Sequence, residues 1–367
     1  MNARTRTSAF TSVAPDPHGA VERLRATYLQ GQAACDELVL LARALPEWPL
    51  AAAQAAVVDG VLACAPAREF PPNSRRTSRF VRLLVRALED ESDVEEIDER
   101  LLRMCATLPM TPLVAAPELA YLHFHVGADA APIVLRAADA WGAGAETGCC
   151  VWDAGAWLAF YALARPELFA SRCVVELGSG CGLLSCLLAR ECAASELVAT
   201  DVYGATVDNL RANLRRNGGA DVPVLAAHGV AAHVALRRDQ GLPTVCCATL
   251  DWTEPTLASA TALAAVTPDV VVAADCVYSE ELLDGLARTI RALLARPSAI
   301  ALVASKRRSE ETLRAFEAAL VRHGLQGIEE AIGPPRAESD SDARERAQLW
   351  RLCDPSDVSL LRITPCD

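Results

Sequence analysis

The two residues best placed to do chemistry are an aspartate and a tyrosine three positions apart. Asp275 directly follows the apolar run 269–274, and Tyr278 stands in the turn after it. Ligands bind at the carboxyl ends of strands in open α/β sheets, so we expect both side chains in one cleft. A carboxylate and a phenol hydroxyl accept hydrogen bonds and can hold a reacting group in position. The alternative is a structural pair, a helix-capping aspartate beside a half-buried tyrosine.

A second candidate is the glycine-rich segment 174–183, VVELGSGCGL. An apolar strand runs into Gly178, Gly180 and Gly182, where the backbone can approach a ligand closely and a helix N-terminus can receive polar groups. The spacing G-x-G-x-G departs from the dinucleotide fingerprint G-x-G-x-x-G, because Leu183 stands where the last glycine belongs. It therefore disfavours a nicotinamide cofactor. A P-loop is excluded because no Gly-Lys-Ser/Thr follows.

A third candidate, Asp201, ends the next apolar run about 20 residues after the glycine turn, the distance at which an acidic residue binds ribose in nucleotide folds. There its carboxylate can accept hydrogen bonds from both ribose hydroxyls of an adenosine cofactor. A lone aspartate at a strand end is more often a helix cap or turn residue. Its coupling to the preceding glycine turn favours the ribose role.

The elements that must position these residues follow from the pattern around them. Short β-rich runs alternate with helical patterns, which predicts right-handed βαβ crossovers and a mostly parallel sheet covered on both faces. The last two runs, 325–332 and 348–363, have only a polar segment between them and suggest an antiparallel hairpin at a sheet edge. Residues 218–243 show no clean periodicity. The expected strands are 173–177, 196–201, 244–250, 269–274 and 298–304, and the expected helices are 182–192, 205–217, 280–295 and 310–323.

The N-terminal part of the chain has a different pattern. The first residues are rich in Ser, Thr, Pro and Arg, which is typical of a flexible terminus. Apolar residues then recur at helical spacing as far as Leu108, and Pro109, Pro112 and Pro117 end that pattern. These features predict a flexible N-terminus over 1–20, an all-helical module over 21–115 and an α/β domain over 116–367.

Composition narrows the classes of function. Hydrophobic residues make up 52% of the 367 residues, enough for a packed core. The chain carries 35 basic and 47 acidic residues and a net charge of -12, which disfavours nucleic acid as a partner bound through its phosphates. Lys306 is the only lysine, and we attribute the arginine bias to base composition. No uncharged apolar run reaches the ~18–20 residues of a membrane span, so no membrane partner is expected.

The 14 cysteines lie within apolar stretches of a large chain, and no pair has C-x-x-C spacing. This pattern favours reduced thiols in the cytosol or nucleus over a disulfide framework. It also makes a structural zinc improbable, and His123 and His125 are only two positions apart on a strand-like stretch. We therefore expect no metal site.

The glycine turn and Asp201 together resemble motif I and its partner acidic residue in class I methyltransferases that use S-adenosylmethionine. Four further features narrow the resemblance. They are Thr147-Gly148 just before Val151-Trp152-Asp153-Ala154, the segment Leu250-Asp251-Trp252, the Asp-x-x-Tyr of 275–278, and a helical module ahead of the domain. In combination the chain is similar to the seven-strand protein-lysine methyltransferases of family 16. The match covers roughly residue 118 to the C-terminus, while the helical module matches only by position and length.

The resemblance implies an α/β fold with a Rossmann-like seven-strand sheet, mostly parallel with an antiparallel last strand. It implies S-adenosyl-L-methionine as the cofactor, no metal, and catalysis by Asp275 and Tyr278. The bland alternative for both tryptophans of the site is that they are core aromatics. The cofactor contacts that the resemblance implies are Trp152 beside the cofactor, Gly178, Ser179 and Gly180 at its methionine end, Asp201 at the ribose, and Trp252 and Ala274 near the adenine and sulfonium.

The resemblance also implies a lysine side chain as methyl acceptor, in a cytoplasmic, monomeric enzyme. A lysine amine with pKa ~10.4 must lose a proton before it can attack, which costs about 4.6 kcal/mol at pH 7. Asp275 and Tyr278 would supply acceptors that orient the neutral amine. Within the family the similarity is greatest to the members that methylate elongation factor 2, which makes that protein the expected substrate. Another protein, a small molecule, or a catalytically silent cofactor-binding role remain the alternatives.

Signatures of nucleic-acid methyltransferases are missing from the turn after the fourth expected strand. A C5-pyrimidine enzyme would present Pro-Cys there, whereas Cys276 follows an aspartate and Pro365-Cys366 lies at the tail. The Asn/Asp-Pro-Pro-Tyr/Phe signature of amino-methylating nucleic-acid enzymes is also absent. Together with the acidic net charge, this makes nucleic acid a poor substrate candidate.

Overall fold

The computed structural model describes residues 17–108, 119–127, 130–138, 147–218, 220–222, 234–237, 244–253, 266–330 and 353–366. The chain divides into two compact units. The first comprises 1–28, 33–69 and 74–110, and the second comprises 29–32, 70–73 and 111–367. The three prolines expected at the domain boundary lie outside the described residues.

The first unit is helical, as the sequence predicts. Its long apolar pattern over 21–45 is interrupted at Gly31, whose φ of 80° ends one helix before the next begins. The first helix starts at Pro17, where the sequence predicted helix only from residue 21. Buried Tyr28 packs against Phe80 with ring centroids 5.8 Å apart, and its hydroxyl lies 2.8 Å from Thr77 Oγ1. The helices are α1 (Pro17–Gln30), α2 (Cys35–Arg43), α3 (Ala51–Val57), the π-helical turn η1 (Val58–Leu62), α4 (Ala65–Glu69), α5 (Ser74–Glu89) and α6 (Glu99–Thr107).

The second unit contains a nine-stranded sheet in the order β10-β11-β9-β8-β3-β4-β7-β6-β5. Five adjacent strands from β9 to β7 are parallel, and the strands beyond them at both edges pair antiparallel. β11 lies between β9 and β10, so the predicted terminal hairpin and the antiparallel last strand are both present. The strands are β3 (Cys173–Leu177), β4 (Glu196–Asp201), β5 (Ala220–Val222), β6 (Val234–Arg237), β7 (Thr244–Thr249), β8 (Val270–Ala274), β9 (Ile300–Lys306), β10 (Leu325–Glu329) and β11 (Val358–Pro365).

Seven of these strands are those that the sequence predicts, and β5 and β6 are two short additions at one edge. Both lie in the region 218–243, where the sequence showed no periodicity. Residues 348–352 of the last expected strand lie outside the described residues. The seven-strand, mostly parallel architecture is therefore confirmed, with a wider edge than expected.

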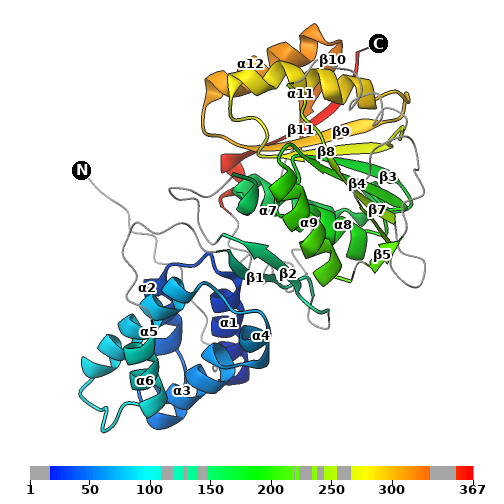
Figure 1. The fold of residues 1–367 in the computed structure, drawn as a ribbon. Coiled ribbons are helices and arrows are strands. Elements are labelled where there is room, and N and C mark those ends of the chain that lie inside the picture. The colour runs from blue at the N-terminus through cyan, green and yellow to red at the C-terminus, as the bar shows by residue number, and fades with distance from the viewer. Residues whose placement is uncertain are drawn as a thin grey trace, which may run out of the picture. The chain divides into compact units, whose positions relative to one another are not determined.

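Helices cover both faces of the sheet (Figure 1). On one face lie α7 (Asp153–Ala164), α8 (Leu183–Arg190) and α9 (Gly204–Arg216), and on the other α11 (Glu280–Leu293) and α12 (Glu310–Arg322). Alternate strand residues feed the two cores, as a sheet buried on both sides requires. Val174 and Val272 pack with the first set of helices, whereas Val175 and Val271 pack with the second.

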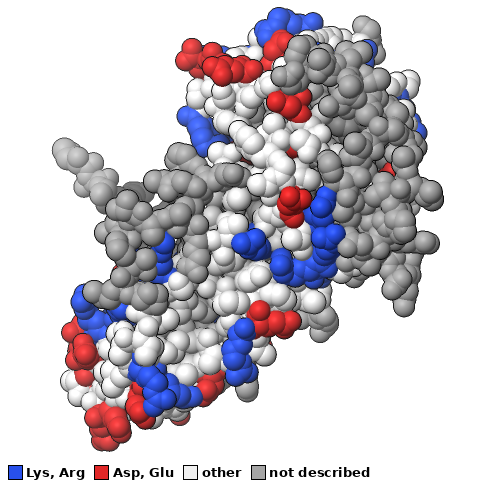
Figure 2. Space-filling model, viewed as in Figure 1, with Lys and Arg blue, Asp and Glu red and all other residues white. Residues whose placement is uncertain are grey.

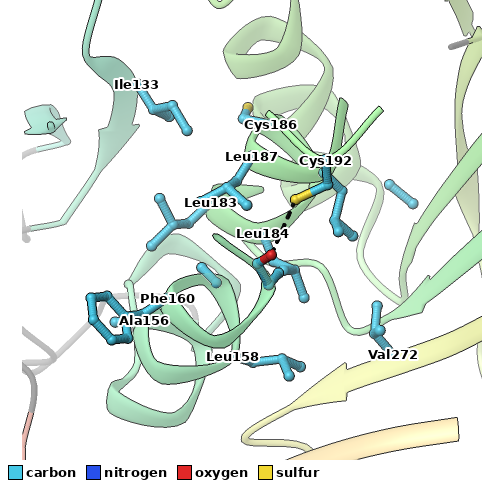
Figure 3. Packing of buried hydrophobic residues seen from close by; sticks show 14 of the residues in the cluster. Ile133, Ala156, Leu158, Phe160, Leu183, Leu184, Cys186, Leu187, Cys192 and Val272 are labelled. Atoms are coloured by element: carbon cyan, nitrogen blue, oxygen red, sulfur yellow. Dashed lines mark hydrogen bonds between the residues drawn. The ribbon is translucent and has the colours of Figure 1, made fainter. Parts of the chain in front are cut away.

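Figure 3 shows part of the first core, where α7 and α8 pack side by side through Leu158, Leu183, Leu184 and other apolar side chains. The Cys192 thiol donates a hydrogen bond to the Ala162 carbonyl over 3.5 Å. All 14 cysteines lie within the described ranges, and none of them forms a disulfide there. This packing holds α7 and α8 against the sheet.

A separate hairpin of β1 (Ala120–Phe124) and β2 (Ile133–Ala137) was not anticipated from the sequence. It is tied to α9 by backbone N–H groups that donate to side chains, from Val134 to Asn217 (2.9 Å) and from Arg136 to Asn213 (2.8 Å). His123 on β1 is buried, and burial lowers its pKa to about 4, so its imidazole is neutral at pH 7. In the ranges that the structure describes, no three His, Cys, Asp or Glu side chains group as metal ligands do.

Basic side chains gather on one face, over α9 and the hairpin (Figure 2). Arg216 lies over the Tyr121 ring, with its Cζ 4.8 Å from the centroid. None of the helices in the described parts of the chain has both the length and the apolar character of a membrane span.

Candidate functional site

The candidate site lies at the carboxyl ends of β4, β3 and β8, three neighbouring strands. From β3 the chain crosses through α8 to β4 on one side, and β8 pairs on the other side of β3. Such a reversal of strand order opens a crevice outside the strand ends. A cavity of about 280 Å³ lies there. The lining residues are Thr147, Gly148, Trp152, Gly178, Gly180, Asp201, Val202, Tyr203, Asp251, Trp252, Thr253, Ala274, Asp275, Cys276, Tyr278 and Leu282.

The glycine turn after β3 forms one wall, and it needs glycines for two physical reasons. Gly178 and Gly180 have φ values of 68° and 54°, which residues with a Cβ adopt at a cost. A Cβ on Gly178 would lie 2.6 Å from Cys276 Sγ, and one on Gly180 would lie 3.2 Å from the Gly148 carbonyl oxygen. The turn therefore keeps the backbone close to the cavity and leaves no space for side chains.

Asp201 ends β4 beside this turn and is 7% exposed. Its Oδ2 accepts a hydrogen bond from the Gly180 N–H (2.9 Å), and its Oδ1 accepts one from the Val202 N–H (2.8 Å). Both bonds orient the carboxylate at the cavity wall. The strand-end aspartate is thus coupled to the glycine turn, as its spacing suggested.

Ser179 behaves differently from the other residues of the turn, because it does not line the cavity. Its N–H donates to the Thr200 carbonyl (2.8 Å), and its Oγ accepts from the Thr200 N–H (3.1 Å). Ser179 therefore joins the glycine turn to β4. These hydrogen bonds hold the turn in place, and the contact of Ser179 with a ligand stays a prediction.

Glu176 lies one residue before the end of β3 and is buried. The Ser185 hydroxyl of α8 donates a short hydrogen bond to its Oε2. Burial raises the pKa of Glu176 to about 7, against the opposing effect of the Ser185 and Ser179 hydroxyls. A carboxyl of this kind beneath the glycine turn holds a proton more readily than a free glutamate does.

Asp275 directly follows β8 and continues its pairing, since its N–H donates to the Ala304 carbonyl (2.8 Å). Its φ of 53° is a left-handed conformation that aspartate tolerates better than most residues, and it turns the chain out of the sheet. The side chain is only 3% exposed. Asp275 therefore lines the cavity from a fixed strand end, with its side chain almost fully buried.

Three donors hold the Asp275 carboxylate. Oδ2 accepts from the Ala154 N–H at the start of α7 (3.0 Å), while Oδ1 accepts from the Lys306 N–H (3.1 Å) and from Arg308 Nη1 (2.9 Å). The Arg308 guanidinium also lies over the Trp152 ring, with its Cζ 5.3 Å from the centroid. Asp275 is thus anchored by two other elements and by a cation.

Tyr278 shares the cavity with Asp275, as the sequence predicts, and the residue is 54% exposed. Partial burial raises the pKa of its hydroxyl, so the phenol stays protonated at neutral pH. Trp252 lies against the glycine turn, because a Cβ on Gly178 would sit 3.3 Å from its ring. The Trp152 indole N–H donates to the Thr147 carbonyl (2.9 Å), which fixes the ring at the edge of the site.

The structure thus brings eight of the nine predicted site residues to one cavity and leaves Ser179 outside it. Sequence reasoning missed Tyr203, which lines the cavity two residues after Asp201 and is 56% exposed. The strand-end rule that found Asp201 could have found it. Arg308 was also missed, and no local signal marks it, because the pairing of β8 with β9 is what brings it to Asp275.

Comparisons with known proteins point to one family. A family model described as lysine methyltransferase matches residues 131–320, just over half of the chain. Protein-lysine N-methyltransferase EEF2KMT of Homo sapiens is 32% identical over 184 residues, covering 49% of this chain and 52% of that protein. Protein-lysine N-methyltransferase EFM3 of Chaetomium thermophilum is 26% identical over 315 residues, covering 80% of this chain and 87% of that protein. The chain thus spans about half the length of the human relative.

Among solved structures, M. jannaschii TYW2 in complex with AdoMet has 11% identity and a TM-score of 0.36, covering 70% of this chain and 88% of that one. A likeness of this size leaves the fold assignment to the strand order itself. The Chaetomium thermophilum match is more informative about domain organisation. It covers a larger share of the chain than residues 111–367 make up, so it extends into the helical unit.

Proposed function

The chain belongs to the lysine methyltransferase family, and from that premise we propose that it transfers a methyl group from S-adenosylmethionine to a lysine side chain of a protein. The observation that carries the proposal is the placement of Asp275 and Tyr278 in one cavity with the glycine turn and Asp201. A nucleoside-binding wall and a pair of hydrogen-bond acceptors thereby face the same space.

The residues present fit the cofactor. Gly178 and Gly180 leave the backbone bare at the cavity wall, since a Cβ at either would meet Cys276 or Gly148. Asp201 presents a carboxylate fixed by backbone N–H groups, suited to a pair of ribose hydroxyls. Trp252 and Ala274 also line the cavity and can hold the apolar parts of an adenosine. In this proposal these residues, with Trp152, bind the cofactor.

The reaction is a displacement in which the amine lone pair forms an N–C bond while the S–C bond of the cofactor breaks and its electron pair stays on sulfur. The protein must therefore present a neutral amine in line with that bond. Asp275 and the Tyr278 hydroxyl accept hydrogen bonds from the amine and direct its lone pair. The proton lost before attack leaves to solvent past the half-exposed tyrosine.

We propose elongation factor 2 as the protein substrate, with the helical unit contributing to its recognition. The sequence resemblance to the enzymes of that factor supports this choice, and so does the 32% identity over 184 residues to protein-lysine N-methyltransferase EEF2KMT of Homo sapiens. The Chaetomium thermophilum match extends into the helical unit, which fits a contribution of that unit to the recognition of a protein substrate. We propose a cytoplasmic location, which fits the absence of disulfides among the 14 cysteines, all of which the structure describes. We propose that it acts as a monomer.

The test is methyl transfer from radiolabelled S-adenosylmethionine to purified elongation factor 2, and to a lysate of cells that lack this protein. We expect one labelled band at the mass of elongation factor 2, with the label on a lysine by mass spectrometry. The matched control is Asp275→Asn, because asparagine also tolerates the left-handed backbone at this position.

Each other outcome removes one part of the proposal. A labelled lysate band of another mass would leave lysine methylation standing and exclude elongation factor 2. Transfer that persists after deletion of residues 1–110 would exclude recognition by the helical unit. Cofactor binding without transfer to any protein would favour a small-molecule substrate or a silent binding role.

A further inference from the structure

The contact between Arg308 and Asp275 has a consequence for the state of the substrate amine. We propose that Arg308 offsets the charge of Asp275, so that this carboxylate can orient a lysine amine without holding it in its protonated form. The inference rests on the proposed function, because it concerns a lysine amine at that site. It makes Arg308 a positioning residue that acts through Asp275.

The physical problem is that a lone carboxylate opposes the reaction that it should assist. An opposite charge within ~4–6 Å favours the charged form of an amine, and only the neutral form has a lone pair for attack. A nearby cation has the reverse effect and is one way in which proteins activate lysine amines. A carboxylate paired with a guanidinium keeps its acceptor oxygens while the net charge of the pair is close to zero.

The geometry of the Asp275–Arg308 pair meets this requirement. Nη1 of Arg308 lies 2.9 Å from Oδ1 of Asp275, whose side chain is 3% exposed, so solvent screens the pair little on that side. The guanidinium is also held over the Trp152 ring, which limits its freedom to leave the carboxylate. The two remaining donors to Asp275, from Ala154 and Lys306, are neutral backbone N–H groups.

The charges around the cavity make such compensation necessary. The charged side chains among the described residues that line it are Asp201, Asp251 and Asp275, all acidic. Lys306, the last residue of β9, forms an ion pair with Asp153 of α7, so its charge is offset locally. From α11, Arg288 donates to the Trp252 carbonyl (2.9 Å) on another side of the cavity.

Two further titratable groups of the cavity, Tyr278 and Cys276, are neutral at pH 7. Partial burial raises the pKa of Tyr278, and burial strongly raises that of the Cys276 thiol. Tyr203 is the remaining phenol that faces the space. An amine that entered this cavity would therefore meet three acidic side chains, and Arg308 is the cation in direct contact with the one proposed to orient it.

The experiment compares Arg308→Gln with Arg308→Lys and Arg307→Gln. The last is a matched control, because Arg307 is adjacent in sequence but pairs with Glu329 and Glu310. The first readout is the pH profile of single-turnover methyl transfer to elongation factor 2. In Arg308→Gln we expect the acid limb to move up by about one pH unit, which lowers the rate at pH 7 about tenfold and lets it recover above pH 9. Arg308→Lys and Arg307→Gln should keep the wild-type profile.

The second readout does not use the methyl acceptor. S-adenosylmethionine carries a positive sulfur and S-adenosylhomocysteine does not, so their affinity ratio reports the negative charge of the cavity. By calorimetry, Arg308→Gln should raise the preference for the charged compound by about threefold, while Arg307→Gln should leave it unchanged. If the wild-type protein bound both compounds but did not methylate elongation factor 2, that protein would be excluded as the substrate. The affinity ratio would then still test whether Arg308 offsets the charge of Asp275.

Three outcomes would overturn it. An unchanged affinity ratio in Arg308→Gln would show that the guanidinium does not offset charge in the cavity. A rate that falls equally at every pH would mean that Arg308 only supports the local structure. A faster Arg308→Gln enzyme at pH 7 would mean that the guanidinium obstructs the place of the amine.

Discussion

Asp201 and Asp275 end strands on opposite sides of β3, line the same cavity and are almost equally buried, at 7% and 8% exposure. Asp201 is fixed by backbone N–H groups of its own turn and of the glycine turn. Asp275 is fixed by N–H groups of α7 and of the end of β9, and by the Arg308 guanidinium. Strand ends thus bring similar carboxylates to one cavity, and their different hydrogen-bond partners suit them to different roles.

The largest effect should come from Asp275→Asn. We expect the rate of methyl transfer to fall about 10³-fold, roughly 4 kcal/mol, because an amide puts donors where the amine needs an acceptor. Cofactor affinity should stay within about threefold of wild type, since Asp275 is assigned to the amine. Single-turnover rates and calorimetric titration with S-adenosylhomocysteine measure the two effects. If the rate of methyl transfer and the cofactor affinity fell by equal factors, the assignment of Asp275 to the amine and of Asp201 to the cofactor would be wrong.

Glu176 is a third carboxyl, on the strand between those of the two aspartates. It shows how burial without an opposite charge nearby changes the pKa of a carboxyl. Its pKa is raised from 4.5 to about 7 by burial. The unfolded chain therefore releases this proton more readily, and the stability that the group contributes is present below pH 4.5 and lost as pH rises through 7. Glu176→Gln removes the titration and keeps the shape of the protonated side chain.

We therefore expect Glu176→Gln to gain stability relative to wild type as pH rises from 5 to 8, by roughly 3 kcal/mol at ~1.36 kcal/mol per unit. Urea unfolding of both proteins at several pH values measures the difference, in which the titrations of other groups cancel. Parallel stability curves would show that Glu176 titrates normally. Glu176 would then not behave as a buried carboxyl without an opposite charge beside it.

Asp201→Asn should weaken cofactor binding about 30-fold, about 2 kcal/mol, because a charged acceptor is lost and an amide group meets the Gly180 or Val202 N–H. The rate at saturating cofactor should change little. Asp208→Asn on α9 is the control, since the Asp208 side chain is 73% exposed and pairs with nearby Arg211. If Asp201→Asn lowered the saturated rate as Asp275→Asn does, the assignment of ribose and amine to different carboxylates would fail.

The sequence predicted most of what these two aspartates share and little of what separates them. Strand ends are visible as apolar runs that stop at a polar residue, so Asp201, Asp275 and the glycine turn could be found by spacing. The partners of Asp275 come from α7 and β9, more than 30 residues away in the case of Arg308. The register of β8 with β9, in which Ala274 pairs with Ala304, brings Arg308 to Asp275.

The same limit explains the parts of the fold that were missed. β5 and β6 are three and four residues long, too short to show periodicity, and exist as strands through pairing at the edge of β7. The β1–β2 hairpin depends on amide side chains of α9, which supply partners for the backbone of β2. Pairing between distant segments leaves no local pattern in either of them.

Ser179 offers the smallest and most discriminating test. The residue sits between Gly178 and Gly180, which line the cavity, but its own hydrogen bonds go to Thr200 on β4 and to the Glu176 side chain. Ser179→Ala removes the Oγ acceptor and leaves the buried Thr200 N–H without this partner, which should cost about 1 kcal/mol of folding stability. Cofactor affinity should stay within about twofold, because the side chain does not face the cavity. Urea unfolding and calorimetry separate the two effects. A large loss of affinity with unchanged stability would return Ser179 to the ligand-binding wall and would show that position in the motif predicts function better than the hydrogen bonds do.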